Sequence, residues 1–302
     1  MKKIIKSVNF TRQGMSKFKL YFFAAFLMHN VAYAQEGQLD FSFDPGTGAN
    51  NAIFTTSIQP GTGGKIIVGG TFNSFNGSPV NYFLRLNSDG TVDNSFNIGT
   101  AANLHVYAIA MQPDGKILLG GSFTTYNGIP VGHVVRLHGN GQRDMTFTTT
   151  GVNNPVLKIN IQKDGKILLS GTFDKYLARL NSNGTIDNTL TFTGTYGPPI
   201  PGANNSILAV GTTSNEQILI GGQFTEFSSI SQNRIARIHK FNGMLDGLFN
   251  VGTGVNNAVR DIAVQKDDKI IIVGDFTSYN GTTRNRIARI NTDGSLDNSF
   301  NP

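Results

Sequence analysis

One short phrase, a Lys-Ile or Gln-Ile segment that runs on to Gly-x-Phe, occurs five times in this 302-residue sequence. Its copies recur at intervals of 51, 50, 51 and 52 residues and begin at Lys65, Lys116, Lys166, Gln217 and Lys269. An Arg-Leu or Arg-Ile pair follows in every copy, at Arg85, Arg136, Arg179, Arg237 and Arg289. A third phrase, Leu-Asp-x-Ser-Phe and its variants, begins at Leu39, Val92, Arg143, Ile186, Leu245 and Leu296. Such a period predicts an array of similar structural units.

The sequence of each unit predicts four short strands. An alternating segment such as residues 106–112 leads through an Asp-Gly turn into the Lys-Ile strand. The Arg-Leu strand, a second Gly-containing turn and the Leu-Asp strand complete the unit. Asp-Gly suits the positive φ angles of a tight hairpin. The Lys-Ile strand is apolar on both faces, as expected for a strand sandwiched between neighbouring sheets.

A sheet with two apolar faces is not stable alone in water, whereas stacking around an axis buries both faces. The predicted fold is therefore all-β, a β-propeller of five four-stranded blades. Its repeats span residues 44–96, 97–147, 148–190, 191–249 and 250–300. Two arrangements stay open: a closed five-bladed ring, with residues 39–43 joining the last sheet, or an open arc of a larger ring. A β-solenoid is the weaker alternative, because its rungs are usually shorter and lack two hairpin turns per repeat.

The third repeat departs from the others in length. Phe173 and Arg179 are 6 positions apart, where the other four repeats have 13. Residues 194–201 then lengthen the connection to the fourth repeat. Loops and connections of this kind tolerate such changes in length.

The repeats resemble a known family. Residues 112–123 and 289–300, which carry all three phrases between them, look like the delta-60 repeat family of bacterial extracellular proteins. The resemblance covers roughly residues 37–302. It implies a propeller-like fold and a cell-surface location, often in Bacteroidota, and it brings no established activity or site residues.

The first 34 residues predict a secretory signal peptide. Basic residues precede an apolar run at residues 20–28, and Ala32 and Ala34 supply the small-x-small cleavage pattern, so cleavage is expected after Ala34. The leader contains six basic residues and no acid, which accounts for the whole net charge of +6. The body, residues 35–302, is neutral and is predicted to bind no nucleic acid. It has no further apolar stretch for membrane insertion and no cysteine, and we expect a secreted or cell-surface monomer stabilised without disulfides.

Most carboxylates recur with the repeat. In four of the five copies the arginine precedes the Leu-Asp acid by eight residues, which predicts a structural ion pair across a hairpin rather than the arginine cluster of a sialidase. Among the unrepeated acids, Asp261 and Asp275 are the pair that a polysaccharide-acting enzyme could use. The five histidines show no ligand spacing. The sequence predicts no catalytic residue, no metal site and no cofactor.

One ring of residues suggests binding. Asn50, Asn103, Asn153, Asn204 and Asn256 recur just before each first strand, and Tyr126 and Tyr279 lie in Tyr-Asn-Gly loops expected on the same face. Amides beside exposed aromatic rings suit recognition of a glycan or an extracellular protein. The structural alternative is that asparagine tolerates an unusual backbone angle and bonds locally.

The leading hypothesis is therefore a secreted or cell-surface, non-enzymatic binding or scaffold propeller. A polysaccharide-acting enzyme of the glycoside hydrolase type and a purely structural surface repeat are the alternatives.

Overall fold

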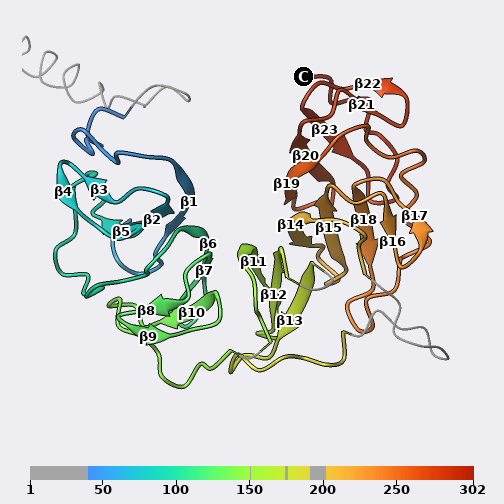
Figure 1. The fold of residues 1–302 in the computed structure, drawn as a ribbon. Coiled ribbons are helices and arrows are strands. Elements are labelled where there is room, and N and C mark those ends of the chain that lie inside the picture. Colours follow the sequence, from blue (N-terminus) through green and yellow to red (C-terminus); the bar gives the residue numbers. More distant parts are fainter. Residues whose placement is uncertain (1–39, 150, 174–175, 191–201) are drawn as a thin grey trace, which may run out of the picture. The chain divides into compact units, whose positions relative to one another are not determined.

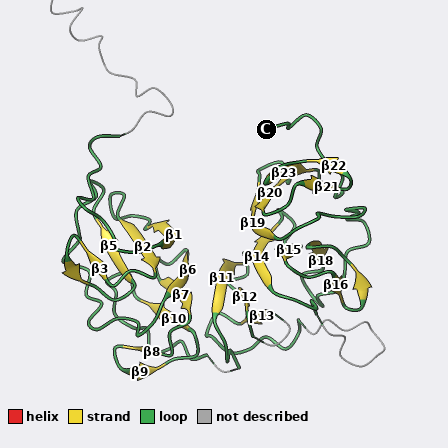
Figure 2. Ribbon diagram, turned by 45° about the horizontal axis from the view of Figure 1, so that its top comes forward, coloured by secondary structure: helices red, strands yellow, loops and turns green. Residues whose placement is uncertain are grey.

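The computed structural model describes residues 40–149, 151–173, 176–190 and 202–302, and every element in them is a strand, a turn or a loop (Figure 2). Phe43–Pro302 form one structural unit. The predicted signal peptide 1–34 with its cleavage site, and the extra residues 194–201, lie outside the described residues. Among those described, no helix is long and apolar enough to cross a membrane.

Five three-stranded antiparallel sheets follow one another along the chain (Figure 1). The first three sheets are β1 (Ile53–Ile58), β2 (Ile66–Gly70) and β5 (Phe83–Leu86); β6 (Val106–Met111), β7 (Ile117–Gly121) and β10 (Val134–Leu137); and β11 (Val156–Ile161), β12 (Ile167–Gly171) and β13 (Leu177–Leu180). The last two are β14 (Ile207–Thr212), β15 (Ile218–Gly222) and β18 (Ile235–Ile238); and β19 (Val259–Val264), β20 (Ile270–Gly274) and β23 (Ile287–Ile290). In every sheet the Lys-Ile strand is central, as its two apolar faces predict.

The connection between the second and third strands forms a small two-stranded ladder in four sheets. These ladders pair β3 (Ser74–Phe75) with β4 (Ser78–Pro79), β8 (Thr125–Tyr126) with β9 (Ile129–Pro130), β16 (Glu226–Phe227) with β17 (Ile230–Ser231), and β21 (Ser278–Tyr279) with β22 (Thr282–Thr283). The third repeat, whose connection is shorter, has no such ladder among its described residues. The loop is therefore the variable part of the repeat.

The predicted fourth strand is reduced to one bridge in each repeat. Val92 bridges Leu86 in the first repeat, and the other four repeats have the equivalent pair. The next residue, Asp93, accepts hydrogen bonds from the N–H and hydroxyl of Ser95 at 3.0 and 2.6 Å. This local turn bends the chain away from the sheet, and the strand stops there.

Consecutive sheets pack closely because glycine lies on one face and a branched residue on the next. A Cβ added to Gly69 would lie 2.8 Å from Cγ1 of Val106, which is fully buried in the next sheet. The phenylalanines that follow the central strands are all buried, each at most 3% exposed. Phe123, Phe173, Phe224 and Phe276 pack between consecutive sheets, as their position predicts, whereas Phe72 packs within the first repeat.

The first and last sheets are not joined by strand pairing in the described part of the chain. Ile53 of β1 is 47% exposed, whereas Val106, at the same position of the second sheet, is fully buried. Phe43 packs against the first sheet, and the N–H of Asp44 donates to the Asp89 carbonyl at 2.8 Å. Of the two arrangements left open by the sequence, the closed ring is not observed: Phe43 lies on the first sheet, and the five described sheets form an array that is not closed.

Candidate functional site

Each sheet contains one buried aspartate that binds the arginine of its third strand. In the second sheet, Asp144 accepts hydrogen bonds from Arg136 Nε at 2.8 Å and from the N–H and hydroxyl of Thr146. Lys116 Nζ lies 3.3 Å from the same carboxylate. The equivalent pairs have Nε–Oδ2 distances of 2.6–2.8 Å and are Arg85–Asp93, Arg179–Asp187, Arg237–Asp246 and Arg289–Asp297. The predicted structural ion pairs are confirmed.

Hydrogen bonding keeps these carboxylates charged. Burial by itself would raise the pKa of Asp144, but hydrogen bonds from Thr146, Arg136 and Lys116 hold that pKa well below its usual value. The pKa values of Asp93 and Asp187 are lowered against burial in the same way. Such carboxylates are poor proton donors at neutral pH, so their contacts serve stability rather than general acid catalysis.

The same arginines connect consecutive sheets. Arg85 Nη1 donates to the Gly139 carbonyl at 2.8 Å, and Arg136 Nη1 donates to the Ser182 carbonyl at 2.5 Å. Arg179 and Arg237 make the equivalent bonds to the carbonyls of Lys240 and Thr292. In each case the acceptor lies three residues after the arginine of the next repeat. The same hydrogen bond, from the arginine of one sheet to a turn carbonyl of the next, therefore recurs at each contact between consecutive sheets.

The asparagines predicted as ligand-binding residues are exposed, but four of the five already hold the neighbouring loop. Asn103 Oδ1 accepts the N–H groups of Thr124 and Thr125 at 2.9 and 3.0 Å, and its Nδ2 donates to the Thr124 hydroxyl. The same clamp recurs at Asn50, Asn204 and Asn256. Asn153, in the repeat with the shortened loop, instead accepts a long bond from Asn154. Their role in binding stays a prediction, and a ligand would compete with these bonds.

The expected exposure of the two tyrosines is wrong. Tyr126 and Tyr279 are 0% exposed. Their hydroxyls donate to the carbonyls of Gly141 and Gly294 at 2.8 and 2.6 Å. Burial raises the pKa of both phenols above the ordinary value. Each ring is an anchor of its loop, because the short ladder turns it inward onto the second turn of its own repeat.

Other aromatic side chains do reach the surface near the start of β1 and β6. Phe54 is 55% exposed and meets Tyr107 edge-on, with 5.6 Å between ring centroids. His105 Nδ1 lies 3.1 Å from the Tyr107 hydroxyl, and the His105 ring contacts Tyr82. These four residues occupy the side of the sheets on which the sequence had placed the binding loops.

The two acids singled out for catalysis each face their own cation. Lys158 Nζ lies 3.0 Å from Asp261, and Arg260 Nη2 lies 2.6 Å from Asp275. Within the described ranges no three His, Asp or Glu side chains cluster as metal ligands would.

Three departures from the repeat meet where the third sheet adjoins the fourth. Leu190 stands at the position where a phenylalanine ring lies over the arginine in the other four repeats. Gln217 replaces the lysine that begins the central strand elsewhere, and its Oε1 accepts the Lys240 N–H at 3.3 Å. The second turn of the fourth repeat is one residue longer, and it leaves Phe241 73% exposed.

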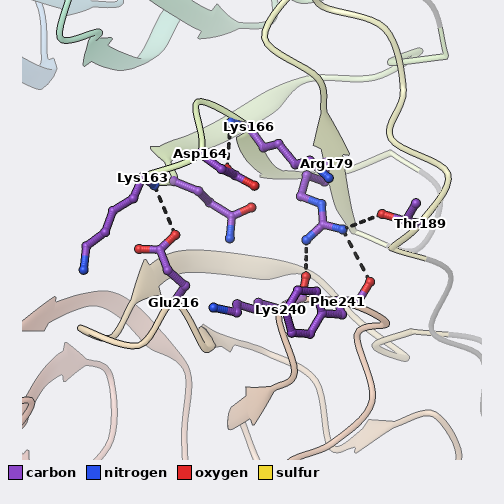
Figure 3. Close-up of a pocket in the computed structure, with 9 residues that line it drawn as sticks. Lys163, Asp164, Lys166, Arg179, Thr189, Glu216, Lys240 and Phe241 are labelled. Carbon is purple, nitrogen blue, oxygen red and sulfur yellow. Dashed lines mark hydrogen bonds between the residues drawn. The ribbon is translucent and has the colours of Figure 1, made fainter.

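One of these departures, Phe241, lines a cavity of about 330 Å³, and Thr189 and Glu216, the neighbours of Leu190 and Gln217 in the sequence, line it too. Figure 3 shows Lys163, Asp164 and Glu216 on one side of it, with Arg179 pointing towards the turn that carries Lys240 and Phe241. The walls are the first turns of the third and fourth repeats and the second turn of the fourth. The cavity therefore lies at the hairpin-turn ends of the sheets, opposite the asparagine loops.

Two ammonium groups at this cavity lack an acidic partner. Lys163 Nζ donates to the Ser214 carbonyl at 2.6 Å, and Lys240 Nζ donates to the Asn215 carbonyl at 3.2 Å. Neither has a carboxylate within 4.0 Å in the described part of the chain. An ammonium group has three N–H donors, so each of these lysines can still donate to an incoming anion.

Acceptors also line the cavity. Glu216 Oε2 accepts the Lys163 N–H at 3.1 Å, and its other oxygen accepts no hydrogen bond from a described residue. Gln162 is only 4% exposed, and its Oε1 has no hydrogen-bond partner among the described residues. A second cavity, of about 350 Å³, adjoins the first and shares Lys163 and Glu216 with it. The arrangement therefore offers donors and acceptors together.

Fold and site together define a β-propeller of tandem repeats with a polar cavity between two of its blades. A family model described as "Domain of unknown function (DUF5122) beta-propeller" matches residues 64–96, 112–147, 162–190, 213–249 and 265–300. The chain belongs to this family of β-propellers.

The chain is similar to several solved structures. A protein of unknown function from Bacteroides caccae is 14% identical with a TM-score of 0.49, over 81% of this chain and 79% of that one. The WD40 propeller domain of Doa1 is 14% identical with a TM-score of 0.48, over 74% of this chain and 59% of that one. Virginiamycin B lyase from Staphylococcus aureus is 15% identical with a TM-score of 0.41, over 64% of this chain and 54% of that one. No curated protein matches the sequence.

Sequence reasoning missed the cavity. Its signals were present in the repeat alignment, as Leu190, Gln217 and the longer turn around Phe241. They could be recognised as departures, but only the contact between the third and fourth sheets shows that they converge.

Proposed function

We propose that the chain is an exported, non-enzymatic binding propeller that holds a ligand in the cavity between its third and fourth sheets. The family assignment and the array of rigid sheets support a binding or scaffold role. The leader predicted over residues 1–34, and the resemblance of the repeats to the delta-60 family, support a place outside the cell or on its surface.

One observation carries the proposal: the departures from an otherwise regular repeat lie at or next to one cavity, with Phe241 in its lining and Leu190 and Gln217 adjacent in sequence to the lining residues Thr189 and Glu216. Residues needed for folding recur in every repeat, as the Arg–Asp pairs do. Leu190, Gln217 and Phe241 occur once each, and all three lie at the same contact between sheets. Phe241 adds an exposed aromatic ring to the polar lining of this cavity, and ligand sites commonly combine apolar surface with a few polar groups.

Binding is preferred to catalysis because the carboxylates of the cavity already hold the turns. Asp164 Oδ1 accepts the Lys166 N–H at 3.0 Å, and Glu216 accepts the Lys163 N–H. A glycoside hydrolase needs one carboxyl group to protonate the leaving oxygen and a second to attack or to activate water. Both side chains belong to turns and accept backbone N–H groups there, which favours a passive site.

Arrays of glycans and peptides test the proposal. The mature chain, residues 35–302, is compared with a Lys240→Gln, Phe241→Ala variant and with a control variant, Phe54→Ala, Arg286→Gln. All four residues have exposed or half-buried side chains, so both variants should fold. We expect binding that the cavity variant loses and the control keeps. Binding that is equal in all three proteins would refute the proposal.

Export is tested separately by mass spectrometry of the protein recovered outside the cells. We expect an N-terminus at Gln35, because cleavage should follow the Ala32-x-Ala34 pattern. Retention of residues 20–28 in the recovered protein would contradict export by a cleaved signal peptide.

A further inference from the structure

We infer that the ligand of this cavity is a carboxylated sugar, such as a uronic acid residue of an acidic polysaccharide. The inference rests on the proposed function, because it names the ligand class of the same site. Charge, an aromatic surface and unpaired acceptors each restrict the class of ligand.

The unpaired ammonium groups require an anion. Lys163 and Lys240 donate only to the backbone carbonyls of Ser214 and Asn215, which belong to the same turn. Both amines therefore bind the same turn. A carboxylate between them forms charge-assisted hydrogen bonds, which are stronger than those between neutral groups.

The exposed Phe241 ring provides an apolar surface beside that charge. Lys240 Nζ lies 5.1 Å from the ring centroid, and the side chain is 73% exposed. The electron-rich face of an aromatic ring attracts the slightly positive C–H groups of a sugar ring. The turn that carries Phe241 is fixed by the Met244 N–H, which donates to Asn242 Oδ1 at 3.1 Å. A sugar that stacks on Phe241 can therefore direct its carboxylate to Lys240.

Acceptors in the cavity distinguish a sugar from other anions. Glu216, Asp164 and the unpartnered Oε1 of Gln162 line the same cavity as the lysines. Gln112 and Gln265 leave the same oxygen unpartnered, but Gln162 is the one at this cavity. Carboxylates and amide oxygens accept hydrogen bonds from hydroxyl groups, which a sugar supplies and the acidic side chains of a peptide do not. A sugar unit with one carboxylate and several hydroxyl groups can bind both the lysine donors and the acceptors of the cavity.

The volume limits the size of what enters. At about 330 Å³ the cavity lies near the lower end of ligand sites. It therefore accommodates a short stretch of a chain, with neighbouring sugar units extending over the adjoining cavity that shares Lys163 and Glu216.

Isothermal titration calorimetry of the mature chain tests the inference with four probes: trigalacturonate, the neutral galactose trimer, a hexaglutamate peptide and inorganic phosphate. We expect trigalacturonate to bind at least about tenfold more tightly than the neutral trimer, since about 1.4 kcal/mol corresponds to tenfold. Phe241→Ala, Lys163→Gln and Lys240→Gln should each weaken trigalacturonate by about five- to tenfold. The Phe54→Ala, Arg286→Gln variant should bind as the wild type does, and added salt should weaken the interaction.

The outcomes separate the ligand class from the binding site. Equal affinity for acidic and neutral trimers, or tighter binding of hexaglutamate or phosphate, overturns the sugar assignment. If that binding is still lost in Phe241→Ala, the proposed function survives. If trigalacturonate binds equally to the wild type and to all three cavity variants, both the inference and the proposed function are wrong.

Discussion

Replacing Asp144 by asparagine should destabilise the chain strongly, because this carboxylate balances two cations in the interior. Its side chain is 1% exposed, and that of Arg136 is 8% exposed. Asparagine keeps an oxygen for the Thr146 N–H and hydroxyl but removes the negative charge. Lys116, whose side chain is 29% exposed, can turn to solvent. Arg136 cannot, because its Nη1 is held by the Ser182 carbonyl of the next sheet.

The loss of stability is determined by Arg136, whose buried charge has no partner once Asp144 is replaced. Removing one partner of a buried ion pair costs about 3–5 kcal/mol. Since Lys116 can relax and the hydrogen bonds from Thr146 persist, we expect a value near the lower end, about 3 kcal/mol. Asp114→Asn is the matched control, because Asp114 is 56% exposed and pairs only with Lys116 at 3.5 Å. That control should cost less than about 1 kcal/mol.

Guanidinium titration followed by far-ultraviolet circular dichroism measures both variants, since the chain contains no tryptophan. Adding Arg136→Met to Asp144→Asn should cost less than the sum of the two single changes, because it removes the uncompensated charge. A loss below about 1 kcal/mol for Asp144→Asn, equal to that of the control, would refute a stabilising role for the buried pairs.

Three further predictions concern the stability of the repeated fold. Phe123→Ala should lower the free energy of unfolding by about 3–5 kcal/mol, since the ring is fully buried, and a denaturant titration showing less than about 1 kcal/mol would contradict that packing. Gly121→Ala should be destabilising because its Cβ would lie 2.0 Å from the His105 carbonyl oxygen, whereas Gly247→Ala, with open space around it, should leave the melting temperature unchanged. Stability should be constant near neutral pH and fall as the pH drops below about 4, because the pKa of Asp93, Asp144 and Asp187 is lower in the folded chain than the unfolded value. An acid titration without loss of structure down to about pH 2 would show that these pKa values are not lowered.

The repeated part of this molecule could be predicted because each strand and turn is specified locally. The Lys-Ile strand is apolar on both faces, and the sheets contain it as the central strand. The Arg–Asp spacing of eight residues brings the two groups together across a hairpin, and the measured contacts follow. Five copies of the same pattern reinforce each assignment.

The tyrosines and the cavity could not be predicted, because both depend on contacts between segments distant in sequence. Tyr126 looks exposed in a Tyr-Asn-Gly loop until the β8–β9 ladder turns its ring inward to Gly141. Arg179 and Phe241 lie 62 residues apart, and their contact depends on the packing of the third sheet against the fourth. For the asparagines that precede each first strand, the sequence shows the regular spacing. It does not show which loop each side chain binds.

The most direct test of a ligand site between the third and fourth sheets is a crystal structure of the mature chain with trigalacturonate. We predict electron density for a sugar between Lys163 and Lys240, with one ring face against Phe241. Density instead beside Phe54 and Tyr107, or along the loops that carry Asn103 and Asn204, would place recognition at the opposite ends of the sheets and contradict the site proposed for this propeller.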